Sequence, residues 1–235
     1  MFIEKFCTKT GDKIEFTRQQ ASDFAKNIAD DFNPLHDVDA KKFCVPGDLL
    51  FSLVLAKSGL SQEMSFTFSG MVSDGIVLNF PNEIDSDASI FDDNNKEYMR
   101  ISASGDITKD DDLIDSLVKS YVEFSGHTFP HILVKLMAEK NVMINPARPM
   151  VMYESMSIHL DRLDVPQVGL QFSDSSLTIE GKRGKACLEF DLVYQDTIIG
   201  HGKKHMLLSG LREYCPEVME NLVEGYNLKK SSYFS

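Results

Sequence analysis

Apolar residues recur at helical spacing near the start of the chain and stop at a sharp break. One stripe follows the i, i+3, i+4, i+7 pattern of an amphipathic helix: Ala21, Phe24, Ala25, Ile28, Ala29 and Phe32. Thr17 and Gln20 precede the stripe with the spacing of a capping box. Asn33-Pro34 is expected to end this helix, because the residue before a proline is disfavoured in the α conformation.

A second helix is predicted where the chain is apolar on nearly all sides. Residues 45–60, "VPGDLLFSLVLAKSGL", open with Pro46-Gly47 and stay apolar until Gly59. A helix with no polar face belongs in the interior of a protein. The acidic residues 81–95 are expected to form a solvated loop. Around that loop, alternating apolar and polar residues predict strands at 64–72, 75–80 and 96–107.

The second half of the chain repeats this order. Residues 110–124 carry acids in the predicted first helical turn and an apolar stripe behind them. "SGHT" interrupts this helix, and residues 129–142 predict a second, largely apolar one. Between residues 149 and 211, alternating segments joined by Gly-, Asp- and Ser-containing turns predict antiparallel strands. From about Arg212 the tail is expected to form a short helix and a frayed end.

Each half thus contains a helix, a break, a buried helix and antiparallel strands. A curved antiparallel sheet can wrap an apolar helix, and two such units side by side can share one sheet and hide two edges. The pattern therefore predicts an α+β protein of the double hotdog type, with one unit in residues 1–110 and a second, degenerate unit in residues 111–235. An α+β domain without internal symmetry is the alternative.

The charge balance narrows the class of partner. The 235 residues include 24 Lys and Arg against 36 Asp and Glu, which gives a formal net charge of −12. Such a chain repels nucleic-acid backbones and anionic membranes, so neither is expected as a partner. The N-terminus lacks a secretory pattern, no apolar run is long enough to span a membrane, and the four cysteines are irregularly spaced. We therefore expect a soluble cytoplasmic protein with free thiols.

The break after the first helix holds the best candidates for catalysis. Asp31 and His36 flank Asn33-Pro34, and a rigid turn can point both side chains into one space. A carboxylate and an imidazole that share one water molecule form a general-base pair. Asn33 can fix the turn by bonding to the backbone. Asp, Asn and Pro are also ordinary turn formers, so a helix end without catalysis is the alternative.

The head of the buried helix offers a second component. Its free backbone N–H groups and its dipole can polarise a carbonyl oxygen that gains negative charge. Gly47 has no side chain, so a substrate carbonyl can approach the backbone closely. A thioester conjugated to a double bond would then be open to attack by water at its β carbon.

These residues resemble a known family. "DFNPLH" is similar to the Asp-x-Asn-Pro-Leu-His motif of the MaoC-like (R)-specific enoyl-CoA hydratases, and the resemblance covers roughly residues 10–60. It implies that Asp31 and His36 activate water and that the amide at Gly47 holds the thioester oxygen. It also implies a trans-2-enoyl thioester as substrate, with coenzyme A as part of that substrate and no separate cofactor.

The chain departs from the family at the site itself. Asp30 stands where the family has a small residue, and a second carboxylate beside Asp31 can raise one pKa. Pro46 replaces the usual His before Gly47, and an anionic Asp48 would oppose the charge that forms there unless it points away. The second half has no Asn-Pro-Leu-His, so at most one site per chain is expected.

Basic residues are candidates for binding the phosphates of coenzyme A. They are Lys41 and Lys42 near the motif, and Lys182, Arg183 and Lys185 in a predicted hairpin with Lys203 and Lys204 on a neighbouring strand. The competing interpretation of the hairpin is a solvated turn that protects a sheet edge.

Two pairs of histidines are further candidates. His127 and His131 either cap a helix or serve a site in the degenerate half. His201 and His205 share one face of a strand without a third ligand, so no metal site is expected.

The sequence therefore predicts a hydratase that adds water to an enoyl thioester, with activity reduced or lost at the altered positions. Two other functions stay open. One is a hotdog protein that binds an acyl thioester or another protein without turnover. The other is an acyl-CoA thioesterase that uses Asp31 as the base. The expected partner is a small molecule of the acyl-CoA type, bound by a monomeric double hotdog or a homodimer.

Overall fold

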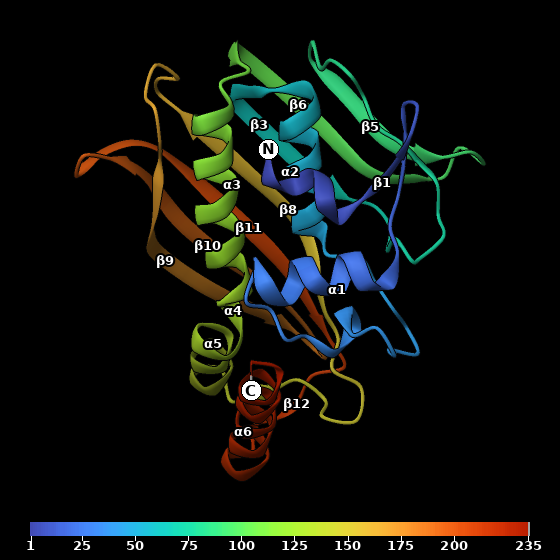
Figure 1. The fold of residues 1–235 in the computed structure, drawn as a ribbon. Coiled ribbons are helices and arrows are strands. Elements are labelled where there is room, and N and C mark those ends of the chain that lie inside the picture. Colours follow the sequence, from blue (N-terminus) through green and yellow to red (C-terminus); the bar gives the residue numbers. More distant parts are fainter. Residues whose placement is uncertain (235) are drawn as a thin grey trace.

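A single antiparallel sheet of ten strands forms the centre of the computed structural model, which describes residues 1–234. The strands follow one another across the sheet in the order β1-β2-β4-β5-β6-β3-β8-β11-β10-β9 (Figure 1). Their bounds are β1 Thr8–Thr10, β2 Lys13–Glu15, β3 Leu60–Phe68, β4 Leu78–Asn79, β5 Asp87–Asp92, β6 Glu97–Thr108, β8 Val151–Leu160, β9 Gly169–Glu180, β10 Arg183–Tyr194 and β11 Thr197–Ser209. Two short strands, β7 (Val142–Met143) and β12 (Arg212–Glu213), pair separately.

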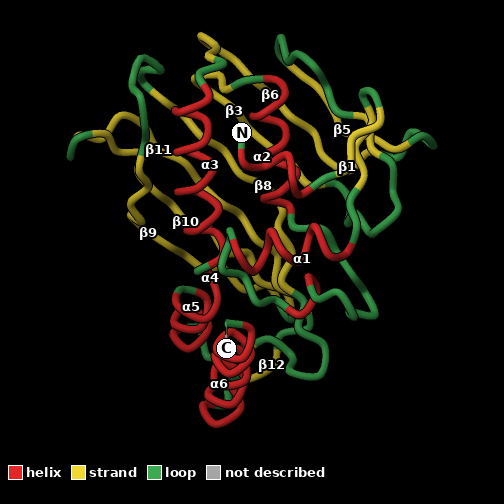
Figure 2. The backbone as a smooth tube through the Cα atoms, in the orientation of Figure 1, coloured by secondary structure: helices red, strands yellow, loops and turns green. Residues whose placement is uncertain are grey.

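Helices cover one face of this sheet, and two of them run side by side across it (Figures 1 and 2). The helices are η1 Phe2–Phe6, α1 Arg18–Asn27, η2 Pro34–His36, α2 Gly47–Ser58, α3 Asp111–Gly126, α4 Thr128–His131, α5 Leu133–Glu139 and α6 Pro216–Tyr233. The side-by-side pair is α2 and α3. Within the described residues, no helix has the length and apolar character needed to cross a membrane.

The two halves of the chain meet at one strand pair in the middle of the sheet. Residues 8–108 supply the first six strands in the sheet order, and residues 151–209 supply the other four. At the junction β3 pairs with β8, with a register running from Glu63 opposite His159 to Thr67 opposite Ser155. One central helix from each half lies on this shared sheet. The predicted α+β double hotdog is therefore confirmed.

Aromatic contacts show that the two halves share one core. The ring of Phe51 on α2 lies 5.1 Å from Phe66 on β3 and 5.0 Å from Tyr121 on α3. Tyr121 in turn lies 5.6 Å from Phe190 on β10. All four side chains are fully buried. The short helix η1 also contacts α2. The prediction of a fully buried helix after residue 46 is thus confirmed.

The second central helix is α3, and the prediction that residues 129–142 form a buried helix is wrong. Phe129 has an extended backbone (φ −110°, ψ 131°) that interrupts α4, and the regular helix α5 begins only at Leu133. The cause is Pro130, which disfavours the α conformation in the residue before it. Residues of α5 instead contribute to a second, smaller core cluster together with α6.

Other boundaries also differ from the prediction. The acidic segment 81–95 contains strand β5, in which Ile90 is fully buried and pairs with Met99 of β6. The tail forms an 18-residue helix, α6, rather than a short one. The capping box at Thr17 and Gln20 is confirmed, but α1 ends at Asn27, before Asn33-Pro34. All four cysteines are free thiols.

Candidate active site

The loop after α1 is held by its own polar side chains. Asp30 has a positive φ of 54°, which turns the chain sharply away from the helix. The Asp31 carboxylate then accepts a hydrogen bond from the Asn33 amide through Oδ1 (2.8 Å), and the Asn33 side chain accepts one from the amide of Leu35 (3.1 Å). Asn33 therefore fixes the turn by bonding to the backbone, as the sequence predicts.

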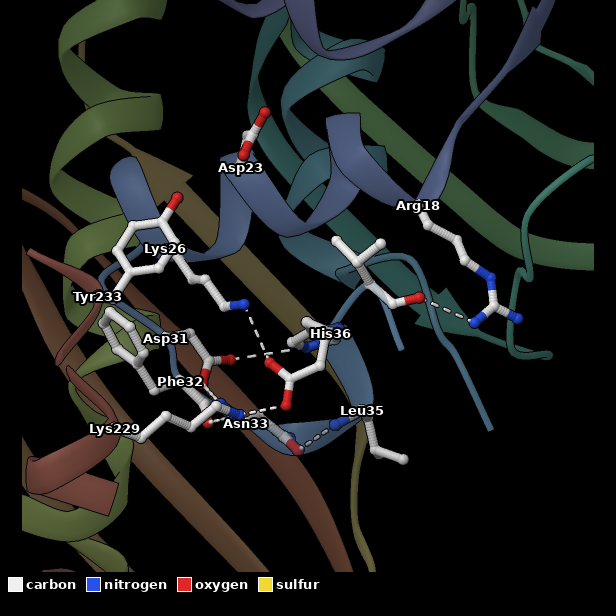
Figure 3. Close-up of polar contacts among 12 residues, drawn as sticks. Arg18, Asp23, Lys26, Asp31, Phe32, Asn33, Leu35, His36, Lys229 and Tyr233 are labelled. Carbon is white, nitrogen blue, oxygen red and sulfur yellow. Dashed lines mark hydrogen bonds and ion pairs between the residues drawn. The ribbon is translucent and has the colours of Figure 1, made fainter. Parts of the chain in front are cut away.

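Asp31 and His36 point toward one another across this turn (Figure 3). Asp31 Oδ2 lies 3.6 Å from His36 Nε2. On the other side of the ring, His36 Nδ1 lies 2.7 Å from the backbone oxygen of Cys44. A carbonyl oxygen only accepts hydrogen bonds, so Nδ1 carries the hydrogen, and in the neutral ring Nε2 presents its lone pair to the side of Asp31. The Asp31 side chain is 28% exposed and that of His36 is 11% exposed, so the pair is reachable from solvent.

The neighbouring carboxylates are engaged elsewhere. Asp37 is paired with Lys26, at 3.0 Å, and with Lys229 of α6. Asp30 is paired with Lys230 of α6, and its Oδ2 lies 2.8 Å from His127 Nε2. The expected crowding of Asp31 by Asp30 is therefore relieved, because the Asp30 side chain turns toward α6 and His127. This leaves Asp31 as the carboxylate that faces His36.

Helix α6 closes over the backbone of this loop. The hydroxyl of Tyr226 accepts a hydrogen bond from the amide of Phe32 (3.1 Å) and donates one to the backbone oxygen of Asp30 (3.3 Å). The Phe32 ring is fully buried, and it makes edge contacts with the rings of Tyr226, Tyr233 and Phe234. Burial raises the pKa of Tyr226. The sequence gives no sign of this cover, because the contacting residues lie about two hundred positions from the loop.

Two aromatic rings pack against Gly47 at the head of α2. A Cβ at this position would lie 2.8 Å from Cε1 of Phe68 and 3.1 Å from Cδ1 of Tyr153. The missing side chain therefore makes room for two aromatic rings. These rings lie on the side where a side chain would project, and the approach of a substrate carbonyl to the Gly47 amide stays a prediction.

Asp48 points into the protein and joins a buried polar chain. Its Oδ2 accepts a hydrogen bond from the Ser125 hydroxyl on α3, and that hydroxyl accepts one from Lys204 Nζ on β11. Burial raises the pKa of Asp48, although the nearby Lys204 ammonium opposes this, and burial lowers the pKa of Lys204. Gly126, the residue after Ser125 on α3, packs against the motif loop, and a Cβ there would lie 3.4 Å from the amide nitrogen of Asp31. The buried polar chain therefore lies beside the loop that carries Asp31 and His36.

Sequence reasoning missed Ser125 and misplaced Lys204. The sequence predicts that Ser125 belongs to a helix break and that Lys204 belongs to a group of basic residues that could bind phosphates. On β11 the inward positions are even-numbered, as Met206 and Leu208 show, and this parity also places Lys204 inside. Its neighbour Lys203 is outward and pairs with Glu189 at 2.9 Å.

The remaining candidates lie on the surface. Lys41 and Lys42 are exposed on the turn that follows the motif loop. The hairpin residues are also exposed, and they lie where β9 turns into β10: Lys182, Arg183 and Lys185. Among the described residues, no group of three or more His, Cys, Asp or Glu side chains has the geometry of a metal site, the region of His201 and His205 included.

Some solved structures are similar to this one, but their sequence identities and TM-scores are low. An acyl-CoA thioesterase II from Mycobacterium marinum is 9% identical, with a TM-score of 0.46 over 92% of this chain and 99% of that chain. A protein described as having a hot dog fold, from Alicyclobacillus acidocaldarius, is 7% identical, with a TM-score of 0.47 over 89% of this chain and 98% of that chain. These values are too low to support an inference about this protein.

Comparisons at the level of sequence give one family. No curated protein matches the chain. The resemblance of residues 10–60 to the MaoC-like hydratases therefore stays a prediction. A family model described as "Protein of unknown function (DUF3581)" matches residues 1–217, which is most of the sequence, and the chain belongs to this family.

Proposed function

We propose that this protein activates a water molecule between Asp31 and His36 for attack on an acyl thioester. One observation carries the proposal. The Cys44 carbonyl holds Nδ1 of His36, so Nε2 and Asp31 Oδ2 face the same space at a separation of 3.6 Å. A water molecule beside them can give one proton to Nε2 while it donates its other hydrogen bond to the carboxylate.

Hydrolysis of the thioester is the reaction that this geometry supports best. The water oxygen bonds to the carbonyl carbon as His36 Nε2 takes the proton, and Asp31 stabilises the imidazolium that forms. The tetrahedral intermediate then breaks its C–S bond, and the thiolate leaves with the proton held by His36. The carbonyl oxygen becomes negative in this intermediate, so the reaction also needs a hydrogen-bond donor for that oxygen.

Hydration of an enoyl thioester is the second candidate. The arrangement of Asp31, Asn33 and His36 around the Asn-Pro turn matches the residue order of the hydratase motif and supports this reaction. Hydration adds water at the β carbon and makes the same carbonyl oxygen negative, so both reactions need a donor for that oxygen. Pro46 stands where the hydratase motif has His before Gly47, and this departure favours hydrolysis.

Coenzyme A is the proposed carrier of the acyl group. Lys41 and Lys42 are exposed a few residues after His36, where they can pair with the phosphates of a carrier that enters from solvent. The exposed residues Lys182, Arg183 and Lys185 are the alternative phosphate contacts.

Turnover of crotonyl-CoA tests the proposal. Release of free thiol reports hydrolysis, and loss of enoyl absorbance without thiol release reports hydration. We expect thiol release, reduced about 10²-fold or more in Asp31→Asn and His36→Gln, since general acid–base groups contribute roughly 10² to 10⁴ in rate. Asp39→Asn, an exposed carboxylate in the same loop, serves as the matched control. Absence of turnover together with measurable acyl-CoA binding would instead identify a binding protein.

A further inference from the structure

One oxygen of Asp48 has no partner. Asp48 is 8% exposed, and its Oδ2 accepts the hydrogen bond from Ser125. Its Oδ1 is buried and has no hydrogen-bond partner within residues 1–234. Burying an ionised carboxylate oxygen without a hydrogen-bond donor costs free energy, because the oxygen loses its hydrogen bonds to water and no protein group replaces them. The carboxyl is therefore expected to hold a proton or to meet a ligand at Oδ1.

The charges around Asp48 come from three elements. The groups that interact electrostatically with Asp48 are Lys204 on β11, Tyr121 on α3, and Asp31 and His36 on the motif loop. Burial raises the pKa of Asp48 and is the largest influence on it, while the Lys204 ammonium and the Ser125 hydrogen bond act in the opposite direction. Burial also lowers the pKa of Lys204, so both ends of the Asp48–Ser125–Lys204 chain are driven toward their neutral forms.

We propose that Asp48 is a neutral carboxylic acid whose Oδ1–H donates a hydrogen bond to the carbonyl oxygen of the acyl thioester. The inference rests on the proposed function and supplies a side-chain donor for the carbonyl oxygen. Since Oδ2 accepts from Ser125, the proton resides on Oδ1, the oxygen that has no partner in the protein. A preorganised donor of this kind stabilises the oxygen as it becomes negative during water attack.

The position of Asp48 fits this role. It lies at the first turn of α2, whose dipole also favours negative charge on a bound oxygen. Ser125, which donates to Asp48, is followed by Gly126, where a Cβ would lie 3.4 Å from the amide nitrogen of Asp31, so Asp48 and the motif loop meet at the same end of α3. Oδ1 is closed off from solvent, so the acyl group reaches it only by displacing neighbouring side chains. The proton remains on Asp48 throughout, and the acid acts only as a hydrogen-bond donor.

Two substitutions separate a donor from a base. Asp48→Asn keeps an N–H donor of the same shape, whereas Asp48→Leu has none. We expect Asp48→Asn to keep thiol release from crotonyl-CoA within about tenfold of the wild type, and Asp48→Leu to lose about 10² to 10³, the usual effect of removing one oxyanion donor. Asp112→Asn, an exposed carboxylate on α3, is the control. Equal losses in Asp48→Asn and Asp48→Leu would overturn the proposal, because they would require the ionised carboxylate.

Infrared difference spectroscopy of the unmodified full chain provides a readout that needs no turnover. A protonated carboxyl band should be present in the wild type at neutral pH and missing in Asp48→Asn. Absence of that band in the wild type would overturn the proposal even if Asp48→Leu did not fold. A band that is present in a protein without turnover would instead contradict the proposed function, while the protonated state of Asp48 would stand.

Discussion

At the scale of single residues, one backbone contact decides the chemistry of His36. The Cys44 carbonyl accepts from Nδ1 and thereby leaves Nε2 to face Asp31. The sequence shows both motif residues, since they are five positions apart and separated by an Asn-Pro turn. It does not show the tautomer, because Cys44 meets His36 only after the loop has folded back.

Gly47 is predicted to be required for the packing of two aromatic rings. Gly47→Ala would push a methyl group against Phe68 and Tyr153, and overpacking of this kind costs about 1–3 kcal/mol of unfolding free energy. Urea denaturation measures the cost. Adding Phe68→Leu should recover part of it in a double-mutant cycle. Gly225→Ala on α6, where a Cβ would meet nothing within 4 Å, is the control and should be neutral or stabilising. A neutral Gly47→Ala would show that the rings move aside easily.

Asp48 is expected to make stability depend on pH in an unusual direction. Burial raises its pKa above the ordinary 3.8, so the folded state keeps a proton that the unfolded state releases. Above pH 3.8 the unfolded state is therefore favoured progressively, until the pH passes the folded pKa. The stability of the wild type relative to Asp48→Asn should fall over this range in a pH series of urea denaturation curves. A relative stability that rises with pH would show that Asp48 is an ordinary ion-paired carboxylate.

At the scale of elements, the spacing of apolar residues predicts α1, α2 and α3 well. The stripes of α1 and α3 and the all-round apolar character of α2 are visible in the sequence. The sequence does not show that α3 is the second central helix, because an amphipathic stripe does not reveal whether a helix lies on the middle or the edge of a sheet. The sequence predicts a short helix where the structure has the 18-residue α6. Most residues of α6 are polar, and it contacts the motif loop, which is distant in the sequence.

The contact between α6 and the motif loop is predicted to order that loop. Tyr226→Phe removes the acceptor of the buried Phe32 amide, which should cost about 1–3 kcal/mol of unfolding free energy and speed hydrogen exchange at Phe32. Tyr233→Phe is the matched control: its hydroxyl accepts from Asn27 at an exposed position, so the change should be about 0.5 kcal/mol or less. Equal effects of the two substitutions would show that α6 only rests on the loop.

At the scale of the whole molecule, the candidate site depends on the joining of the two halves. Asp31, His36 and Asp48 come from the first half, whereas Ser125 and Lys204 come from the second. A single sequence reveals the local motif but not residues that long-range sheet pairing brings to it. For this reason the Asp31–His36 pair could be predicted, and the Asp48–Ser125–Lys204 chain could not.

The shared core predicts one cooperative unfolding transition. Since Phe51, Tyr121 and Phe190 pack together across the junction, neither half can keep its core alone. Calorimetry should show a single peak, with coincident curves from far-UV circular dichroism and tyrosine fluorescence. Two separated transitions would mean that residues 1–110 and 111–235 fold as independent units.

The most direct measurement of the central claim follows the oxygen of the attacking water. After incubation with crotonyl-CoA in H₂¹⁸O, mass spectrometry locates the heavy oxygen. The account predicts label in the carboxylate of the released acid, at rates that fall sharply in Asp31→Asn and His36→Gln. Label in a hydroxyl of the intact thioester would indicate hydration by the same pair. Unlabelled substrate, or labelling that survives both substitutions, would contradict a water-activating role for Asp31 and His36.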